Sequence, residues 1–227
     1  MIWQDSGYLL SKIKYSENNI IVEFFTKSYG KVSGLIFGAS SKKIKNYLLI
    51  GNKFHINYSA KSDNKIGSFK VEIDKITTPN FLDNKQKLSC IVYSINLIKI
   101  LSADNQTNVN IYNLINYFYD LLASDNWLQK FIIWELDVLK SFGYELNIED
   151  YIIKKISNGV EKFYQKNNQN KIIPNFLVNS NDYVKNKDDL VDGLNLVGDF
   201  LSKSILIPNN MNYPNSRIDF INSIKYP

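Results

Sequence analysis

The chain has 227 residues, of which 44% are hydrophobic, 14% aromatic and 22% charged. This composition is typical of a folded globular protein with its own core and excludes a disordered or collagen-like chain. A single cysteine and a single histidine exclude an intramolecular disulfide and a multi-cysteine or His-rich metal centre. No apolar run approaches the roughly 18 residues of a membrane span, and the first residues lack a signal-peptide pattern, so we expect a cytoplasmic protein.

The net charge of +5 is unevenly distributed along the chain. Residues 1–80 hold 12 of the 27 Lys and Arg residues and 6 of the 22 Asp and Glu residues, a balance of 12 − 6 = +6. Residues 81–227 hold the other 15 Lys and Arg residues and the other 16 Asp and Glu residues, a balance of 15 − 16 = −1. An AT-rich coding sequence explains the preference for Lys over Arg, but it does not explain this asymmetry. The N-terminal third is therefore predicted to bind a polyanion.

The first 76 residues alternate short β-branched and aromatic runs with turn signals. The predicted strands are Gly7–Tyr15, Asn19–Thr26, Lys31–Phe37, Lys53–Tyr58 and Ser68–Ile76. Five strands in fewer than 80 residues favour an OB-fold barrel over a seven-stranded sandwich. Residues 40–46, between the third and fourth strands, are predicted to form a polar and basic connection.

After Pro79 the hydrophobic period becomes that of a helix. Helices are predicted at 81–103, 108–123, 125–143, 188–206 and 214–224, with Asp125 as an N-cap and Gly143 as a C-terminal stop. Residues 151–173 are predicted to be irregular, with a tight turn at 167–170. The predicted fold class is α+β: an N-terminal five-stranded OB-fold β-barrel (residues 1–78), followed by an α-helical domain (79–227) that contains the irregular, zinc-less insert at 151–173.

The sequence lacks the motifs of nucleotide-driven enzymes. There is no Gly-x-x-x-x-Gly-Lys-Ser/Thr loop and no Gly-x-Gly-x-x-Gly, so the phosphate cradles of ATPases and dinucleotide enzymes are missing. The acidic groups at 149–150 and 188–192 lie at predicted helix ends, where acidic residues complement the helix dipole, which makes catalysis the less favoured interpretation. His55 and Cys90 are predicted to be structural. Any work on nucleic acid is therefore expected to run without nucleotide hydrolysis and without a nucleotide cofactor.

The residues predicted to contact a nucleic acid are lysines of the basic N-terminal third, together with one tyrosine that could stack on a base. Some of these lysines cluster in the connection after the third strand, and the others lie beside strand ends. The full set is Lys14, Lys27, Lys31, Lys42, Lys43, Lys45 and Tyr15. The alternative is that the cluster is only a solvated face and that the tyrosine belongs to the core.

Ordered motifs run through most of the chain. The N-terminal motifs are Trp3-x-Asp5-x-Gly7-Tyr8-Leu9-Leu10, Tyr15-Ser16-Glu17-x-x-Ile20, Phe25-Thr26-x-x-Tyr29-Gly30, Gly34-x-x-x-Gly38-Ala39-x-Ser41-Lys42-Lys43 and Leu49-x-Gly51-Asn52. The later motifs are Phe131-x-x-Trp134-Glu135-Leu136-x-x-Leu139-x-x-Phe142-Gly143-Tyr144, Ile173-Pro174-x-Phe176-Leu177 and Gly193-Leu194-x-Leu196-x-Gly198-x-Phe200-Leu201, followed by Arg217. In their order and spacing, these motifs resemble the RecO family of bacterial recombination mediators.

The resemblance implies an OB-fold, a helical domain and a non-enzymatic role in DNA repair at the nucleoid. It also implies binding of single- and double-stranded DNA, annealing of complementary strands, and joint work with RecR to load RecA on strands coated with the single-strand-binding protein SSB. Many members carry a four-cysteine zinc module where this chain has Tyr151 and no cysteine, so zinc is expected to be absent. The family binds the C-terminal tail of SSB on the helical domain, where Lys130 is the nearest candidate residue.

Two other functions stay open at this point. One is an adaptor that bridges SSB and RecR and touches DNA only incidentally. The other is an RNA-binding OB module in translation, which the long helical half makes less favoured.

Overall fold

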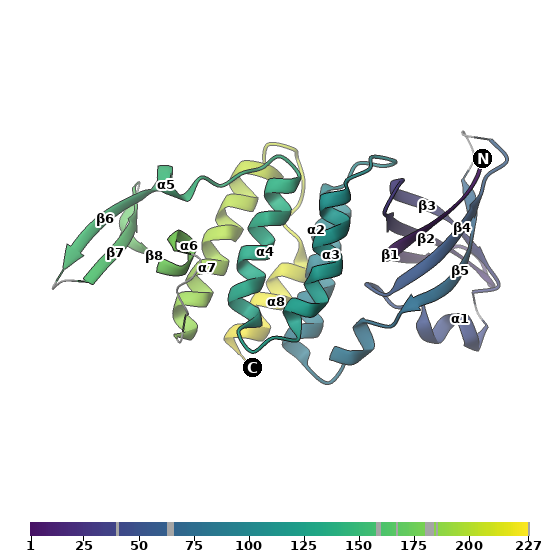
Figure 1. The fold of residues 1–227 in the computed structure, drawn as a ribbon, viewed down its shortest axis with the longest axis horizontal. Helices are drawn as coiled ribbons and strands as arrows, with labels where there is room; N and C mark the ends of the chain where they lie inside the picture. Colours follow the sequence, from purple (N-terminus) through teal and green to yellow (C-terminus); the bar gives the residue numbers. More distant parts are fainter. Residues whose placement is uncertain are drawn as a thin grey trace. The chain divides into compact units, whose positions relative to one another are not determined.

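The first five strands close into a β-barrel (Figure 1). They are β1 (Ile2–Lys14), β2 (Asn19–Thr26), β3 (Gly30–Phe37), β4 (Lys53–Ser59) and β5 (Gly67–Lys75). Their order is β1-β2-β3-β5-β4, with β4 paired back onto β1 and a parallel contact between β3 and β5. The OB-fold barrel and the α+β class predicted from the sequence are confirmed.

The computed structural model describes residues 1–39, 41–62, 66–157, 160–166, 168–179, 184 and 186–226. The chain divides into two compact units. The first unit contains residues 1–115 and 216–223, and the second contains residues 116–215 and 224–227. In the described part of the chain, no helix is both long and apolar enough to cross a membrane.

Strand β1 begins earlier than the sequence predicted because its first half has a partner of its own. Residues 2–8 pair with β4, whereas residues 7–14 pair with β2. A register shift between Leu9 and Ser11 marks the irregularity in the pairing with β2. The inward-facing side chains of all five strands meet in one core, which includes Trp3, Leu9, Val22, Phe24, Val32, Phe54, Ile56 and Phe69.

The polar connection predicted at 40–46 contains a short helix, α1 (Lys42–Tyr47). Ser41 caps it, because its hydroxyl accepts the N–H of Ile44 at 3.5 Å. Ile44 and Tyr47 pack against the barrel core, so two apolar residues in a polar segment hold the helix in place. Asn52 is fully buried just beyond this helix and donates its side-chain N–H to the Tyr47 carbonyl at 2.8 Å.

Helix α2 (Lys85–Leu101) is packed with the barrel rather than apart from it. Lys99 Nζ lies 2.7 Å from Glu23 Oε2 of β2. The rings of Tyr8 in β1 and Tyr112 in α3 (Val109–Leu122) have centroids 5.7 Å apart. Because these contacts join the helices to the barrel, the first compact unit continues past the barrel and ends within α3. The domain boundary predicted at residue 78 stays a prediction.

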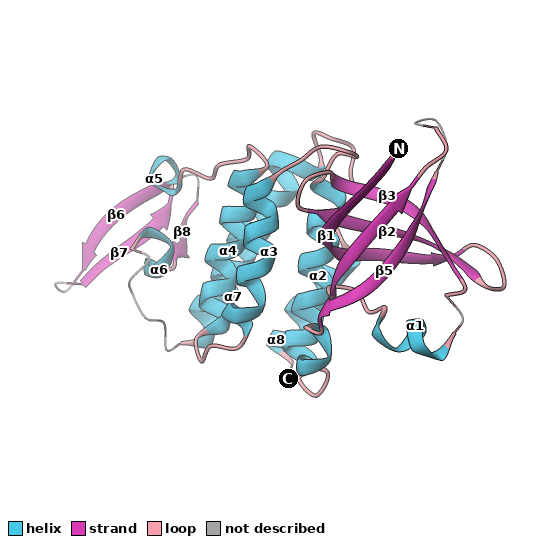
Figure 2. Ribbon diagram, turned by 45° about the vertical axis from the view of Figure 1, so that its right-hand side comes forward, coloured by secondary structure: helices cyan, strands magenta, loops and turns pink. Residues whose placement is uncertain are grey.

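The first unit also contains one short 3-10 helix and most of the helix labelled α8 in Figure 2. The short 3-10 helix η1 (Thr78–Phe81) leads from β5 to α2. Residues 216–223 of α8 (Asn215–Lys225) belong to the same unit. Arg217 of α8 is fully buried, and it donates a hydrogen bond to the hydroxyl of Tyr93 in α2. A buried guanidinium therefore links the end of the chain to α2.

The second unit is built on helices packed through aromatic side chains. Its helices are α4 (Trp127–Ser141), α5 (Ile148–Tyr151), α6 (Asn175–Val178) and α7 (Lys187–Phe200), which continues as the π-helical turn η2 (Leu201–Leu206). The rings of Phe118 in α3 and Trp134 in α4 have centroids 4.7 Å apart. The helix predicted at 188–206 is thus one continuous segment whose last turn is wider than an α-helix.

The two ends of α4 differ in how well the sequence predicted them. Its N-cap position is Asn126, so the assignment of Asp125 was wrong by one residue. Its C-terminus was predicted correctly, since Gly143 has a φ of 89°. The N–H groups of Gly143 and Tyr144 donate to the carbonyls of Lys140 and Leu139, which is the Schellman arrangement.

Residues 151–173, predicted to be irregular, contain an antiparallel three-stranded sheet instead. Its strands are β6 (Ile152–Ser157), β7 (Val160–Gln165) and β8 (Asn168–Ile173), in the order β6-β7-β8. The predicted turn at 167–170 was also wrong, because residues 168–170 are in β8, while Asn167 lies outside the described residues. A small apolar cluster of Phe163, Ile173 and Leu196 holds the sheet against α7.

Candidate nucleic-acid interface

The lysines predicted to bind DNA lie at two different places on the barrel. Strand β1 ends at Lys14 and turns into β2, whereas β2 ends at Thr26 and turns through Lys27 into β3. Lys14 pairs with Ile20 and Gly7 pairs with Thr26 in the antiparallel β1–β2 ladder. The two turns therefore lie at opposite ends of β2, and the predicted lysines do not form one cluster.

The β1–β2 surface, formed by Lys12, Lys14, Tyr15 and helix α1, is the first candidate site. Both lysines are exposed, and Tyr15 is 65% exposed, as a base-stacking residue would need to be. Lys12 Nζ donates to the Leu48 carbonyl at 2.7 Å, which brings the end of α1 beside β1. A hollow of about 380 Å³ lies at the β1–β2 turn, and its lining includes Lys12, Lys14, Ser16, Asn18, Ala39 and Leu48.

The predicted cluster of Lys42, Lys43 and Lys45 lies on α1, at the edge of this surface. The side chains of these three lysines are outside what the structure describes. The backbone position is set by Ile44 and Tyr47, which pack on the barrel core. The fold thus brings α1 to the β1–β2 turn, a neighbourhood that sequence spacing does not reveal.

Lys27 and Lys31 flank the β2–β3 turn but differ in their contacts. Lys27 is exposed, and within the described ranges neither it nor Lys14 forms an ion pair. The Lys31 side chain is only 14% exposed, lies 3.1 Å from Asp104 Oδ1 and donates to the Lys99 carbonyl at 3.3 Å. Lys31 therefore holds the loop after α2 to the barrel, which makes it a poor phosphate ligand.

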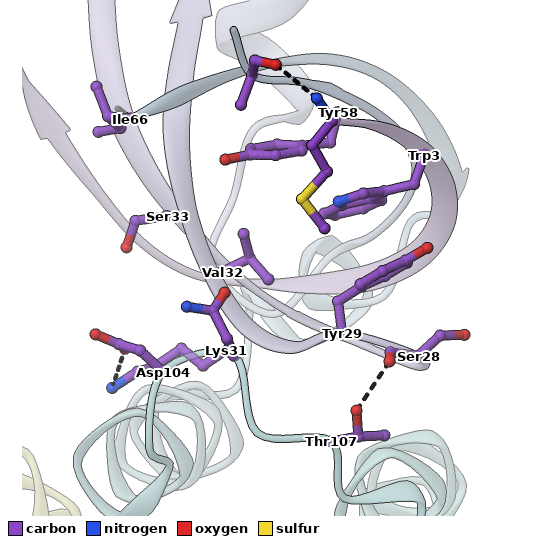
Figure 3. Close-up of a pocket in the computed structure, with 13 residues that line it drawn as sticks. Trp3, Ser28, Tyr29, Lys31, Val32, Ser33, Tyr58, Ile66, Asp104 and Thr107 are labelled. Carbon is purple, nitrogen blue, oxygen red and sulfur yellow. Dashed lines mark hydrogen bonds and ion pairs between the residues drawn. The ribbon is translucent and has the colours of Figure 1, made fainter. Parts of the chain in front are cut away.

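An aromatic pocket lies beside the β2–β3 turn (Figure 3). Its volume is about 640 Å³. Trp3 stacks on both Tyr29 and Tyr58, with ring centroids 4.1 Å and 4.7 Å apart. The pair of Lys31 and Asp104 lines the pocket, so the charges there offset one another. No local sequence signal reveals this pocket, because its three rings come from distant positions.

The Glu23 carboxylate of the barrel is paired with a lysine, so it neutralises none of the exposed lysines. Glu23 lies 2.7 Å from Lys99 Nζ and also accepts a hydrogen bond from Ser11. Burial alone would raise the pKa of Glu23, but the hydrogen bonds from Lys99 and Ser11 outweigh burial and hold its pKa below 4.5. Glu17, exposed in the β1–β2 turn, offsets part of the positive charge there.

The residues at the position of the family's zinc module do not fit a metal. Phe163 and Ile173 are buried there against Leu196, and side chains of this kind offer no metal ligand. Across the described ranges, no group of three or more His, Cys, Asp or Glu residues could hold an ion. The absence of zinc stays a prediction, which elemental analysis of the purified protein checks.

Lys130, the candidate for binding the SSB tail, is half-buried on α4 in the second unit. It belongs to a different unit from the barrel lysines. Among the described residues, no contact of the Lys130 side chain assigns it a role, so its assignment also stays a prediction.

The barrel order and the exposed lysines beside its β1–β2 turn define an OB-fold protein, a class that binds oligonucleotides or oligosaccharides through this region. The family model for the N terminus of recombination protein O matches residues 1–75. The chain belongs to the RecO family of DNA repair proteins.

Curated relatives match along most of the chain. The DNA repair protein RecO of Ehrlichia chaffeensis is 27% identical over 228 residues, which cover 92% of this chain and 93% of that protein. The RecO protein of Rickettsia bellii is 28% identical over 234 residues, which cover 97% of this chain and 95% of that protein. The RecO protein of Rickettsia canadensis is 31% identical over 153 residues, which cover 67% of this chain and 63% of that protein. These matches extend beyond the barrel, so the helical unit shares the relationship.

Proposed function

We propose that the protein is a recombination mediator that binds single- and double-stranded DNA on its barrel and anneals complementary strands. With RecR, it helps to load RecA on strands coated with SSB. The observation that carries this proposal is the β1–β2 surface, where Lys12, Lys14 and Tyr15 are exposed beside α1 on an OB barrel. Family membership supports the same role in DNA repair.

The chemistry of this surface suits binding without sequence preference. Lysine ammonium groups bind phosphates and thereby release the counterions of the DNA. This contribution to the binding free energy is the same for every base sequence. Tyr15 offers an exposed ring for one base, and stacking on an aromatic ring contributes about 1–3 kcal/mol per base. Two complementary strands repel one another, and a lysine-rich surface that neutralises both lowers this barrier to pairing. No nucleotide hydrolysis is needed for such a step.

The proposed protein partners follow the family. We assign the SSB tail to the helical unit, near Lys130, because an acidic apolar tail needs an apolar pocket with a basic rim. RecR and RecA complete the set, and neither has an assigned surface here.

An annealing assay tests the proposal. Complementary labelled oligonucleotides are mixed with the full chain in the absence of ATP, with and without SSB on the strands. We expect faster pairing than without protein, and a large loss of this effect in the Lys12→Gln/Lys14→Gln double variant. The matched control is Lys70→Gln/Lys75→Gln, which removes two exposed lysines from β5 of the same barrel. Equal rates with and without protein, or equal losses in both variants, would contradict the proposal.

An adaptor that bridges SSB and RecR is the second candidate function. The aromatic pocket favours it, because the offset charges of Lys31 and Asp104 suit a protein segment better than a phosphate. The same assay separates the two functions. An adaptor with incidental DNA contact would bind SSB and RecR but would not pair naked strands.

A further inference from the structure

The segment that forms the sheet β6-β7-β8 has a positive net charge, whereas the rest of residues 81–227 has a negative one. Residues 152–173 contain five lysines and one glutamate, a balance of 5 − 1 = +4. The rest of 81–227 holds 10 Lys and Arg residues and 15 Asp and Glu residues, a balance of 10 − 15 = −5. A concentration of one charge sign on one element is the electrostatic footprint of an oppositely charged partner.

The register of this sheet assigns its side chains to two faces. Phe163 pairs with Ile173, and both are buried against Leu196 of α7, so their face is the covered one. Residues that alternate with them point the other way. The side chains of this outer face are Ile153, Lys155, Lys162, Tyr164 and Ile172. Lys155 and Lys162 are exposed, Ile172 is 46% exposed, and the other two are half-buried.

Two lysines stand directly opposite one another on this outer face. Lys155 of β6 pairs with Lys162 of β7. Like charges at opposite cross-strand positions destabilise a sheet. This pair occurs in a sheet that only a small apolar cluster holds in place. An anion that bridges both ammonium groups would convert the repulsion into attraction.

An aromatic ring lies beside the lysine pair. Lys155 Nζ is 5.2 Å from the centre of the Tyr164 ring, and Tyr164 pairs with Ile153 on one side and Ile172 on the other. Lysines interleaved with an aromatic ring on a sheet are the combination that binds single-stranded nucleic acid. The ring and its aliphatic neighbours offer a flat surface for a base, while the lysines take the adjoining phosphates.

The shape of the outer face favours a nucleic-acid strand over an acidic peptide. A peptide that docks through apolar anchors needs pockets for them. The hollow that the structure describes at this sheet, about 100 Å³, includes Gln165, Ile173 and Leu196 in its lining and so opens on the covered face. Stacking requires only one ring face, and the half-buried Tyr164 offers one when the Lys155 ammonium above it moves to a phosphate.

We propose that the outer face of the β6-β7-β8 sheet is a second binding site for single-stranded DNA, distinct from the barrel. The inference rests on the proposed function, because it gives the annealing protein a surface for the second strand. One chain that holds two strands at once makes their encounter effectively intramolecular.

Strand stoichiometry on the full chain tests this site. The probe is a short fluorescent oligothymidylate at low salt, titrated until saturation. We expect two strands per wild-type chain and one strand for Lys155→Gln/Lys162→Gln, with annealing at least about tenfold slower. Lys155→Arg/Lys162→Arg keeps both charges and should keep both strands. The charge-matched control Lys187→Gln/Lys203→Gln, on α7 and η2, should behave as wild type.

Each result bears on a different claim. If the wild type binds one strand, and Lys12→Gln/Lys14→Gln alone removes it, the proposed function stands and the second site is wrong. If the wild type neither binds nor anneals DNA, the proposed function itself fails. If Lys155→Gln/Lys162→Gln loses affinity for a glutamate-rich peptide while its DNA stoichiometry is unchanged, the sheet binds an acidic peptide and the inference is overturned.

A charge reversal separates binding from folding. In Lys162→Glu, the new glutamate faces Lys155 as an opposite charge, so the thermal midpoint should rise while the second strand is lost. A structural role for Lys162 would make both properties change in the same direction.

Discussion

The barrel and the β6-β7-β8 sheet both carry a surplus of lysines, but they support them in different ways. The barrel has an extended core of aromatic and aliphatic side chains and holds Glu23 with Lys99. The small sheet has two buried apolar side chains, Phe163 and Ile173, which pack on Leu196 of α7, and two opposed lysines, Lys155 and Lys162, on its outer face. The barrel lysines are thus supported by an extended core, whereas the lysine pair of the sheet stands on a small apolar cluster.

Truncating the two cores should separate these scaffolds most clearly. Phe24→Ala removes a fully buried ring from the barrel and should lower the free energy of unfolding of the first unit by about 3–5 kcal/mol. Phe163→Ala should open the small sheet locally, because its cluster has so few members. Amide hydrogen exchange is the measurement. Loss of barrel protection in Phe163→Ala would mean that the sheet does not unfold separately.

The lysines of α1 should contribute to DNA affinity but little to stability. If Lys42, Lys43 and Lys45 all contact phosphates, replacing them with Ala lowers the slope of log K against log salt by roughly 3 × 0.7, or about 2. Labelled oligonucleotide is titrated at several salt concentrations, and circular dichroism should be unchanged. The control replaces Lys187, Lys203 and Lys225 with Ala. An unaltered slope in the α1 variant would leave these lysines as a solvated face.

Acid should weaken the attachment of α2 to the barrel. The pKa of Glu23 is held below 4.5, so its contribution is present above that pH and is lost as the pH falls through the lowered value. Glu23→Gln should cost on the order of 1 kcal/mol at neutral pH and progressively less in acid. Thermal midpoints of both proteins, measured across the acid range, check this. A difference that stays constant with pH would refute the assignment to this ion pair.

The smallest expected effect concerns the lysine pair of the small sheet. Lys162→Glu should stabilise the sheet by roughly 0.2–1 kcal/mol, because an opposite-charge pair replaces a like-charge pair. Hydrogen exchange of β6 and β7 measures the gain, and high salt should reduce it. Lys162→Gln serves as the comparison and should give a smaller gain. A less protected sheet in Lys162→Glu would show that repulsion between the lysines is not its weak point.

The lysines show how far a one-dimensional charge count can reach. Counting predicted a basic barrel, and the structure exposes Lys12 and Lys14 beside the β1–β2 turn. Their contact with DNA stays a prediction. Counting could not reveal the ion pair of Lys31, because Asp104 is distant in the sequence and only folding brings it within 3.1 Å. The count also concealed the positive charge of the small sheet. Summed with the acidic rest of residues 81–227, this charge gave a net charge of only −1.

The sequence by itself determined the five barrel strands, the main helices and the end of α4 at Gly143, because local periodicity and backbone conformation decide such elements. Only the tertiary structure decided the helix at α1, where Ile44 and Tyr47 gain burial against the barrel. The same holds for the β6-β7-β8 sheet, whose short polar strands carry little pattern of their own. These strands form because each pairs with a neighbouring strand and because Phe163 is buried against α7. Such contacts arise only when the chain has folded.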